Sequence, residues 1–177
     1  MKKLIPADST NLLLNSTIVL DTNILINISR RSECHEELHK LFMQNNCNYM
    51  SIDLCILEFL RGSSNNLELN NNKELIKIFD IFKIPLSSLS KELEEVSVVY
   101  KQKDTNPSMV DLGLISLLWK YKKYPKIFLL TENYKDFFSP FLDKVLIWNY
   151  EENNKIIPIV LYKINSDEVE KRLKIFN

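Results

Sequence analysis

Residues 18–20 are Ile, Val and Leu, and this apolar run leads directly into Asp21. A short unbroken run rich in β-branched residues is typical of a strand buried on both faces of a parallel sheet. In open α/β sheets, ligands bind outside the carboxyl ends of such strands. The run therefore predicts an α/β fold and places Asp21 where a ligand-facing group is expected.

Short apolar strands alternate with helices along most of the chain. After a first strand at about 17–21, further strands are expected at 48–50, 83–86, 127–130 and 144–148, and helices directly after the first strand and at 33–45, 51–61, 67–83, 90–103 and 107–122. Such alternation implies right-handed crossovers and a mostly parallel sheet. We therefore expect a three-layer α/β/α fold in one domain over 1–177, with its core at about 17–148.

A C-terminal extension is expected at about 151–177, with a strand at 155–164 and a helix at 166–176. The strand is expected to be antiparallel and at an edge of the sheet, because Pro158 cannot donate to a strand ladder. Residues 134–138 are expected to form one helical turn. Residues that favour helix ends mark the other boundaries. They are Thr22 and Asn23 after the first strand, Ser51 and Gly62 at the two ends of the helix between them, Pro107 as a first helical residue, and Ser166 before the last helix.

Composition excludes several classes of function. Only two of the 177 residues are Gly, so neither a dinucleotide-binding fingerprint nor a Walker loop can be written. Basic and acidic residues both number 23, so the total charge does not announce a nucleic-acid binder. Three cysteines without paired spacing fit free thiols in a reducing cytosol, and no apolar run approaches the ~18–20 residues of a membrane span. We expect a cytoplasmic protein without a membrane segment.

Two more acids stand within apolar helices. Glu58 lies in the helix at 51–61, and Asp111 lies within two turns of the start of the helix at 107–122. Burying a lone carboxylate costs several kcal/mol after relaxation, so each of these acids needs a partner. Taken alone, either acid is more often structural, in an ion pair or facing solvent. Gly113, two residues after Asp111, is expected to let that helix pack closely on the sheet.

Several polar residues fall at the carboxyl ends of predicted strands, and therefore on one rim of the sheet. They are Asp21, Ser51 and Thr131. Thr131 is placed to orient a carboxylate or a water, and Asn133 or Asp136 to complete a site. Thr131 and Asn133 fit simple helix capping equally well.

Three carboxylates on or beside one rim, those of Asp21, Glu58 and Asp111, would repel one another. A hard divalent cation relieves such repulsion. Ligation by oxygen alone, with positions left for water, favours Mg²⁺ or Mn²⁺ over Zn²⁺. The pattern therefore predicts a site for Mg²⁺ or Mn²⁺ on this rim.

The order of these residues resembles that of PIN domains, and most of all the toxin-type, VapC-like members, over about 17–148. Two segments carry the resemblance with some specificity: Asp21-Thr22-Asn23 at the first strand end and Thr131-Glu132-Asn133-Tyr134-Lys135-Asp136-Phe137. Between them stand Ser51, Glu58, Gly62 and Asp111-Leu112. By this resemblance, the metal ligands are Asp21, Glu58 and Asp111. The fourth position of the site is often acidic in the family and is Asn133 here. The residues that support the site are Thr22, Asn23, Ser51, Thr131 and Asp136.

The resemblance implies a metal-dependent endoribonuclease that cuts single-stranded RNA and leaves a 5′-phosphate and a 3′-hydroxyl. It also implies a toxin of a toxin–antitoxin pair, with a small antitoxin as partner and a homodimer as assembly. The basic residues nearest the site in sequence are Arg30, Arg31 and Arg61, and these are the candidates for RNA contact. The basic, aromatic segment 120–126 is expected at the opposite end of the sheet, as a solvated loop.

Two other readings compete with a nuclease. A haloacid-dehalogenase-type phosphatase also has an Asp at a strand end, but it needs a second Asp where this chain has Asn23. A PIN-fold module that binds RNA or protein without turnover is compatible with Asn133 in place of an acid, although the other three acids are present.

Overall fold

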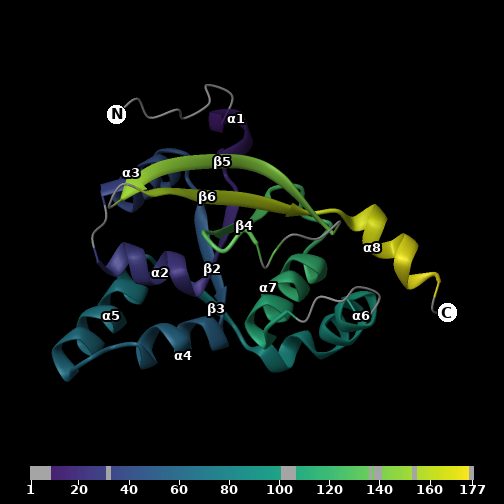
Figure 1. The fold of residues 1–177 in the computed structure, drawn as a ribbon, viewed down its shortest axis with the longest axis horizontal. Coiled ribbons are helices and arrows are strands. Elements are labelled where there is room, and N and C mark those ends of the chain that lie inside the picture. Colours follow the sequence, from purple (N-terminus) through teal and green to yellow (C-terminus); the bar gives the residue numbers. More distant parts are fainter. Residues whose placement is uncertain are drawn as a thin grey trace.

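A computed structural model describes residues 9–30, 33–100, 107–135, 137, 141–152 and 155–175 (Figure 1). Its elements in chain order are α1 (Ser9–Leu13), β1 (Thr17–Leu20), α2 (Thr22–Ser29), α3 (Glu33–Gln44), β2 (Asn48–Ile52), α4 (Asp53–Arg61), α5 (Asn66–Ile78), β3 (Phe82–Ile84), a 3₁₀ turn (Leu86–Leu89), α6 (Ser90–Tyr100), α7 (Met109–Lys120), β4 (Ile127–Thr131), β5 (Leu142–Glu152), β6 (Lys155–Ile164) and α8 (Ser166–Leu173).

The described strands form one six-stranded sheet in the order β3-β2-β1-β4-β6-β5. Neighbours among β3, β2, β1 and β4 pair in parallel, whereas β6 pairs antiparallel with both β4 and β5. The predicted α/β fold with a mostly parallel sheet is confirmed. The connections from β1 to β2 and from β2 to β3 contain helices, as parallel neighbours require.

Helices cover both faces of the sheet, so the predicted three layers are also confirmed. Successive residues of a strand point to opposite faces. Val19 of β1 therefore packs with α6, α7 and α8, whereas Ile18 and Leu20 pack with residues of α2, α3, α4 and α5. In Figure 1, α6 to α8 lie to the right of the central strands, and α2, α4 and α5 lie to their left. Two apolar cores hold the sheet between these helices.

The position of β6 corrects one prediction. The strand is antiparallel, as expected, but it lies between β4 and β5, and the edge strand is β5. Pro158 is tolerated because β4 pairs with β6 only through residues 160–162. Pro158, which is paired with Asn149 of β5, precedes the part of β6 that pairs with β4.

Several helix boundaries differ from those predicted by cap residues. Asp21, rather than Thr22 or Asn23, caps α2; Ser108, rather than a Pro107 start, precedes α7; and Asn165, rather than Ser166, caps α8. Ser51 is the fourth residue of β2 and caps nothing. Gly62 ends α4 as predicted.

Other boundaries differ less. The helix α5 ends at Ile78, before the predicted end, because the chain turns into β3 through Asp80, whose φ is 47°. Tyr134 and Lys135 form a turn, and Asp136 lies outside the described residues. Among the helices that the structure describes, none is long and apolar enough to cross a membrane.

Candidate active site

The order of strands defines a switch point between β1 and β4. The chain proceeds from β1 to β2 and β3 on one side of β1, and then returns to place β4 on its other side. In open α/β sheets, ligands bind in the crevice outside the carboxyl ends of the strands at such a point. Asp21 directly follows β1, and Thr131 is the last residue of β4. The two residues that frame this crevice are therefore both residues that the sequence singled out.

Asp21 is held by three neutral donors. Its Oδ1 accepts a hydrogen bond from the Thr22 backbone N–H at 2.6 Å. Its Oδ2 accepts from Thr131 Oγ1 at 2.6 Å and from Asn23 Nδ2 at 2.9 Å. The side chain is 5% exposed, so its orientation is fixed with little help from solvent.

The surroundings of Asp21 disfavour its charge. Burial, and to a smaller extent the nearby negative charge of Asp111, raise the pKa of Asp21 to about 6, although the three hydrogen bonds lower it. A buried carboxylate beside another carboxylate, without a cationic donor among its bonds, is an unusual arrangement. Perturbed acids of this kind concentrate at functional sites.

Asp111 is buried, as predicted, in a helix that is buried on most sides. It lies in the first turn of α7 and forms a capping box with Ser108. Its Oδ2 accepts from the Ser108 backbone N–H at 3.0 Å and from Ser108 Oγ at 2.6 Å, and its own N–H donates to Ser108 Oγ at 3.1 Å. Asp111 thus helps to cap the start of α7 and also places a negative charge near Asp21 in the crevice.

Gly113 allows the close packing of α7 that the sequence predicted. A Cβ at this position would lie 2.7 Å from Ile52 Cδ1 and 2.8 Å from Leu86 Cδ1. Because Ile52 is the last residue of β2, this approach brings the start of α7 to the same rim as Asp21.

Glu58 corrects a prediction, because it is exposed rather than buried. Its helix is not apolar all round: Cys55, Ile56 and Phe59 face the core, whereas Leu57 is 60% exposed. Glu58 still reaches the rim, since Thr22 Oγ1 donates to its Oε2 at 2.9 Å. Thr22 therefore contacts Glu58 through its hydroxyl and Asp21 through its backbone.

The supporting residues occupy the rim in different ways. Ser51 Oγ donates to the Leu20 carbonyl at 2.7 Å, so it joins the ends of β1 and β2 rather than facing the crevice. Thr131 Oγ1 donates to Asp21 and accepts from the Asn133 backbone N–H at 2.9 Å, which places Asn133 beside the crevice.

The basic candidates lie farther out. Arg61 is exposed and follows Glu58 by three residues on α4, so the two side chains are neighbours on one helix face. Arg30 is exposed at the end of α2, roughly 13 Å along the helix from Asp21 at the usual rise per residue. Arg31 and Asp136 lie outside the described residues.

A second group of polar residues, which the sequence did not reveal, lies directly behind the rim. We call Asn27, His35, Glu132 and Tyr150 the Glu132 cluster. Glu132 Oε1 accepts from Asn27 Nδ2 at 2.8 Å and from the Tyr150 hydroxyl at 3.3 Å, and it lies 2.7 Å from His35 Nε2. His35 is 1% exposed and Glu132 is 13% exposed. The only sequence signal was an acid placed directly after a buried strand.

A divalent cation fits the rim by charge and by donor type. The three acids offer only oxygen ligands, and the repulsion between Asp21 and Asp111 is what a cation would relieve. Their present arrangement does not reach the usual ligand count. Within the described ranges, no group of three or more His, Cys, Asp and Glu side chains could hold a metal ion.

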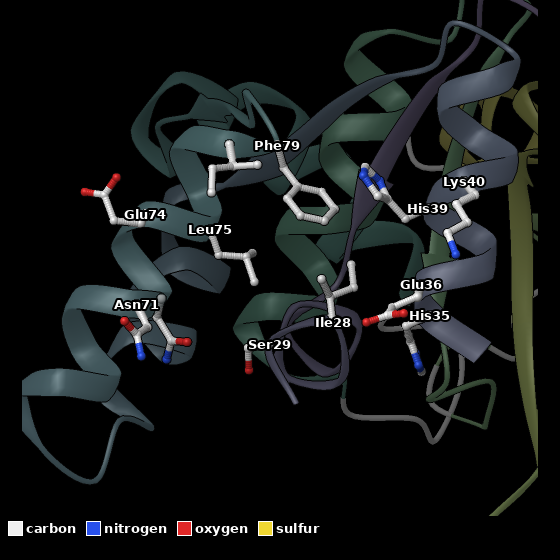
Figure 2. Close-up of a pocket in the computed structure, with 12 residues that line it drawn as sticks. Ile28, Ser29, His35, Glu36, His39, Lys40, Asn71, Glu74, Leu75 and Phe79 are labelled. Atoms are coloured by element: carbon white, nitrogen blue, oxygen red, sulfur yellow. The ribbon is translucent and has the colours of Figure 1, made fainter. Parts of the chain in front are cut away.

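A cavity of about 560 Å³ opens on the other side of α2, between α2, α3 and α5 (Figure 2). Figure 2 shows His39 facing Phe79, and their ring centroids are 4.1 Å apart. None of the three acids lines this cavity, but His35 of the Glu132 cluster does. The cavity and the rim are thus separate features that share α2 and this cluster.

Comparison with known proteins identifies no family. No family model matches the chain, and no curated protein matches it. A solved structure that is similar is described as the crystal structure of VapBC2 from Rickettsia felis bound to a DNA fragment from their promoter. The match has 18% sequence identity and a TM-score of 0.49, and it covers 64% of this chain and 96% of the other.

Proposed function

We propose that this protein is an endoribonuclease that hydrolyses phosphodiester bonds in single-stranded RNA with the help of Mg²⁺ or Mn²⁺. The observation that carries the proposal is the Asp21 carboxylate. It is buried at the switch point of the sheet, held by neutral donors only, and raised in pKa to about 6 by burial and by Asp111. Such a group is suited to a cation that neutralises it.

The residues of the rim have different proposed roles in metal binding and in positioning. Asp21 and Asp111 would hold the cation, and Glu58, which is exposed beside them on the rim, would complete the set of acids. A bound cation would supply charge neutralisation at the phosphate and a water of lowered pKa. Thr131 fixes the direction of the Asp21 carboxylate through its hydrogen bond at 2.6 Å. Asn133 stands beside Thr131 in the fourth position of the motif.

The RNA backbone approaches over the helices that carry the rim. Arg61 is one turn from Glu58 and meets a phosphate close to the cut, whereas Arg30, at the far end of α2, meets phosphates farther along the strand. Arg31 is a further candidate on its place in the sequence. In the cell we expect a cytoplasmic, single-domain PIN-like protein that acts as the toxin of a toxin–antitoxin pair. A small antitoxin and a second copy of the chain are its proposed partners.

A second candidate is a PIN-like module that binds RNA or protein without cutting it. It is favoured by one observation, the absence of a three-ligand metal group among the described side chains. The cleavage assay below separates the two candidates.

The test uses purified protein and an unstructured, 5′-labelled RNA with 5 mM of either cation or with a chelator. We expect cleavage with Mg²⁺ or Mn²⁺, products with a 5′-phosphate, and a loss of at least about 100-fold for Asp21→Asn, since the charged ligand is gone. Asp167→Asn, an exposed acid at the start of α8, is the matched control and should cut like the parent. If no RNA is cut with either cation, or Asp21→Asn cuts as well as the parent, the nuclease proposal fails.

A further inference from the structure

We propose that the Glu132 cluster is a positioning device for the rim, which acts on the Asp21 carboxylate through Asn23. This inference rests on the proposed function of the rim. The cluster is joined to the Asp21 side chain indirectly, through hydrogen bonds of Asn23.

The cluster is a rigid anchor. Three side chains from three separate elements, Asn27 of α2, His35 of α3 and Tyr150 of β5, converge on one oxygen of Glu132. Asn27 and Tyr150 donate hydrogen bonds to this oxygen, and His35 Nε2 lies 2.7 Å from it, at ion-pair distance. Polar networks that join several elements in this way fix the geometry of the backbone that carries them.

The anchor reaches the rim through one amide side chain. The backbone N–H of Glu132 donates to Asn23 Oδ1 at 3.3 Å. At its other end, Asn23 Nδ2 donates to Asp21 Oδ2 at 2.9 Å and lies 3.3 Å from Thr131 Oγ1. Because the oxygen of the amide is engaged by Glu132, its NH₂ group is the end that must face Asp21.

The helix geometry makes this coupling direct. Asn23 and Asn27 are four residues apart on α2, and residues at this spacing lie on the same helix face. Asn27 binds the side chain of Glu132, and Asn23 binds its backbone. A shift of Glu132 therefore moves the face of α2 that orients Asp21. The expected result of disturbing the cluster is slower turnover with little change in RNA binding.

Steady-state cleavage tests the coupling on the active enzyme. We expect Glu132→Gln to lower kcat about 10-fold and to leave KM within about twofold, because residues that orient the ligands of a metal typically cost 10–100-fold when changed. Asn23→Ala should lower kcat at least as much. In the double variant, Glu132→Gln should add nothing to Asn23→Ala, since both act along one path. Independent, multiplicative losses would overturn the proposal.

Ser16→Ala is the matched control for this assay. Ser16 is fully buried and its hydroxyl lies 3.2 Å from Cys47 Sγ, at the opposite end of β1 from the rim. It should destabilise the fold without changing kcat. An equal loss of kcat in Ser16→Ala would show that general destabilisation explains the Glu132 result, and would overturn the proposal.

A measurement without RNA or metal keeps this inference separate from the proposed function. Urea unfolding midpoints of the parent, Glu132→Gln, Asn23→Ala and the double variant should be non-additive, because the two residues share a hydrogen bond. Additive midpoints overturn the positioning role even if the parent cuts RNA, whereas non-additive midpoints support it even if the parent does not. Where Glu132→Gln does not fold, Asn27→Ala removes one donor and should show the same pattern at smaller size.

Discussion

The chain places two carboxylates directly after neighbouring strands, and their surroundings differ. Asp21, which follows β1, is buried and accepts three hydrogen bonds. Glu132, which follows the end of β4, is 13% exposed, accepts hydrogen bonds from Asn27 and Tyr150, and lies 2.7 Å from His35 Nε2. The groups around Glu132 include His35, which can carry a positive charge, whereas those around Asp21 are all neutral. A second carboxylate, Asp111, adds to the repulsion at Asp21 alone.

The difference separates a carboxylate that stabilises the fold from one that costs stability. A buried charge with a matched partner and satisfied hydrogen bonds is tolerated, and removing the partner is strongly destabilising. A buried charge without such a partner is a cost that functional sites retain for their chemistry. We therefore assign the Glu132 cluster to the scaffold that supports the rim, and Asp21 to the ligand-binding role proposed for it.

The largest expected effect is on the free energy of unfolding, which should change in opposite directions when Asp21 and Glu132 are replaced by their neutral amides. The pKa of Asp21 is raised from 3.8 to about 6 in the folded state. Between these two values the folded protein keeps a proton that the unfolded chain releases, so the free energy of unfolding falls as the pH rises. A difference of one pH unit in pKa corresponds to about 1.36 kcal/mol, so above pH 6 the ionised Asp21 lowers the free energy of unfolding by about 3 kcal/mol. Asp21→Asn should thus gain up to about 3 kcal/mol at pH 7.5 and about 1 kcal/mol at pH 4.5.

At pH 7.5, Glu132→Gln should instead lose about 2 kcal/mol, since it removes the charge from a partly buried acceptor of two hydrogen bonds and one ion-pair contact. Urea unfolding in metal-free buffer at both pH values measures these changes. Destabilisation by Asp21→Asn at pH 7.5, or a gain that does not shrink at pH 4.5, would contradict the contrast between the two acids.

The sequence could predict the parts of this contrast that depend on local patterns, but not those that depend on contacts between residues far apart in the chain. The alternation of strands and helices predicts the sheet, and parallel strands bring their carboxyl ends together, so Asp21 and Thr131 were found to share a rim as expected. The exposure of Glu58 was missed, because a helix that is apolar by composition still has one outward face, and composition does not say which face that is.

The Glu132 cluster could not be predicted for a different reason. Its members come from α2, α3, the end of β4 and β5, and Asn27 and Glu132 are separated by 105 residues. No periodicity links positions that meet only after the sheet has formed. Tyr150 reaches the cluster from the β5–β6 hairpin, so part of the support for the site comes from beyond the predicted core.

Tyr150→Phe tests how much the hydrogen bond from β5 contributes to the stability of the Glu132 cluster. The substitution keeps the ring, which packs edge-on against His35 with centroids 5.6 Å apart, and removes only the hydroxyl that donates to Glu132 at 3.3 Å. We expect a loss of about 1 kcal/mol in the free energy of unfolding, the usual net value of one hydrogen bond. Chemical denaturation measures it, with Tyr124→Phe, an exposed tyrosine, as the neutral control. A loss as small as that of the control would mean that β5 does not support the cluster.

Glu58→Gln gives the smallest expected change in stability and tests the rim from its exposed side. Glu58 is exposed, and its one described bond is the 2.9 Å hydrogen bond from Thr22 Oγ1, which a Gln side-chain oxygen can also accept. The free energy of unfolding should change by no more than about 0.5 kcal/mol, as for most surface substitutions. RNA cleavage should nevertheless fall by about 10-fold or more, because a carboxylate proposed to hold the cation becomes a neutral amide. Asp21→Asn and Glu58→Gln would then share a loss of activity while differing in stability, which is the pattern expected of a buried and an exposed ligand of one ion. Full activity of Glu58→Gln at limiting Mn²⁺ would remove Glu58 from the site and leave Asp21 and Asp111 as its only acids among the described residues.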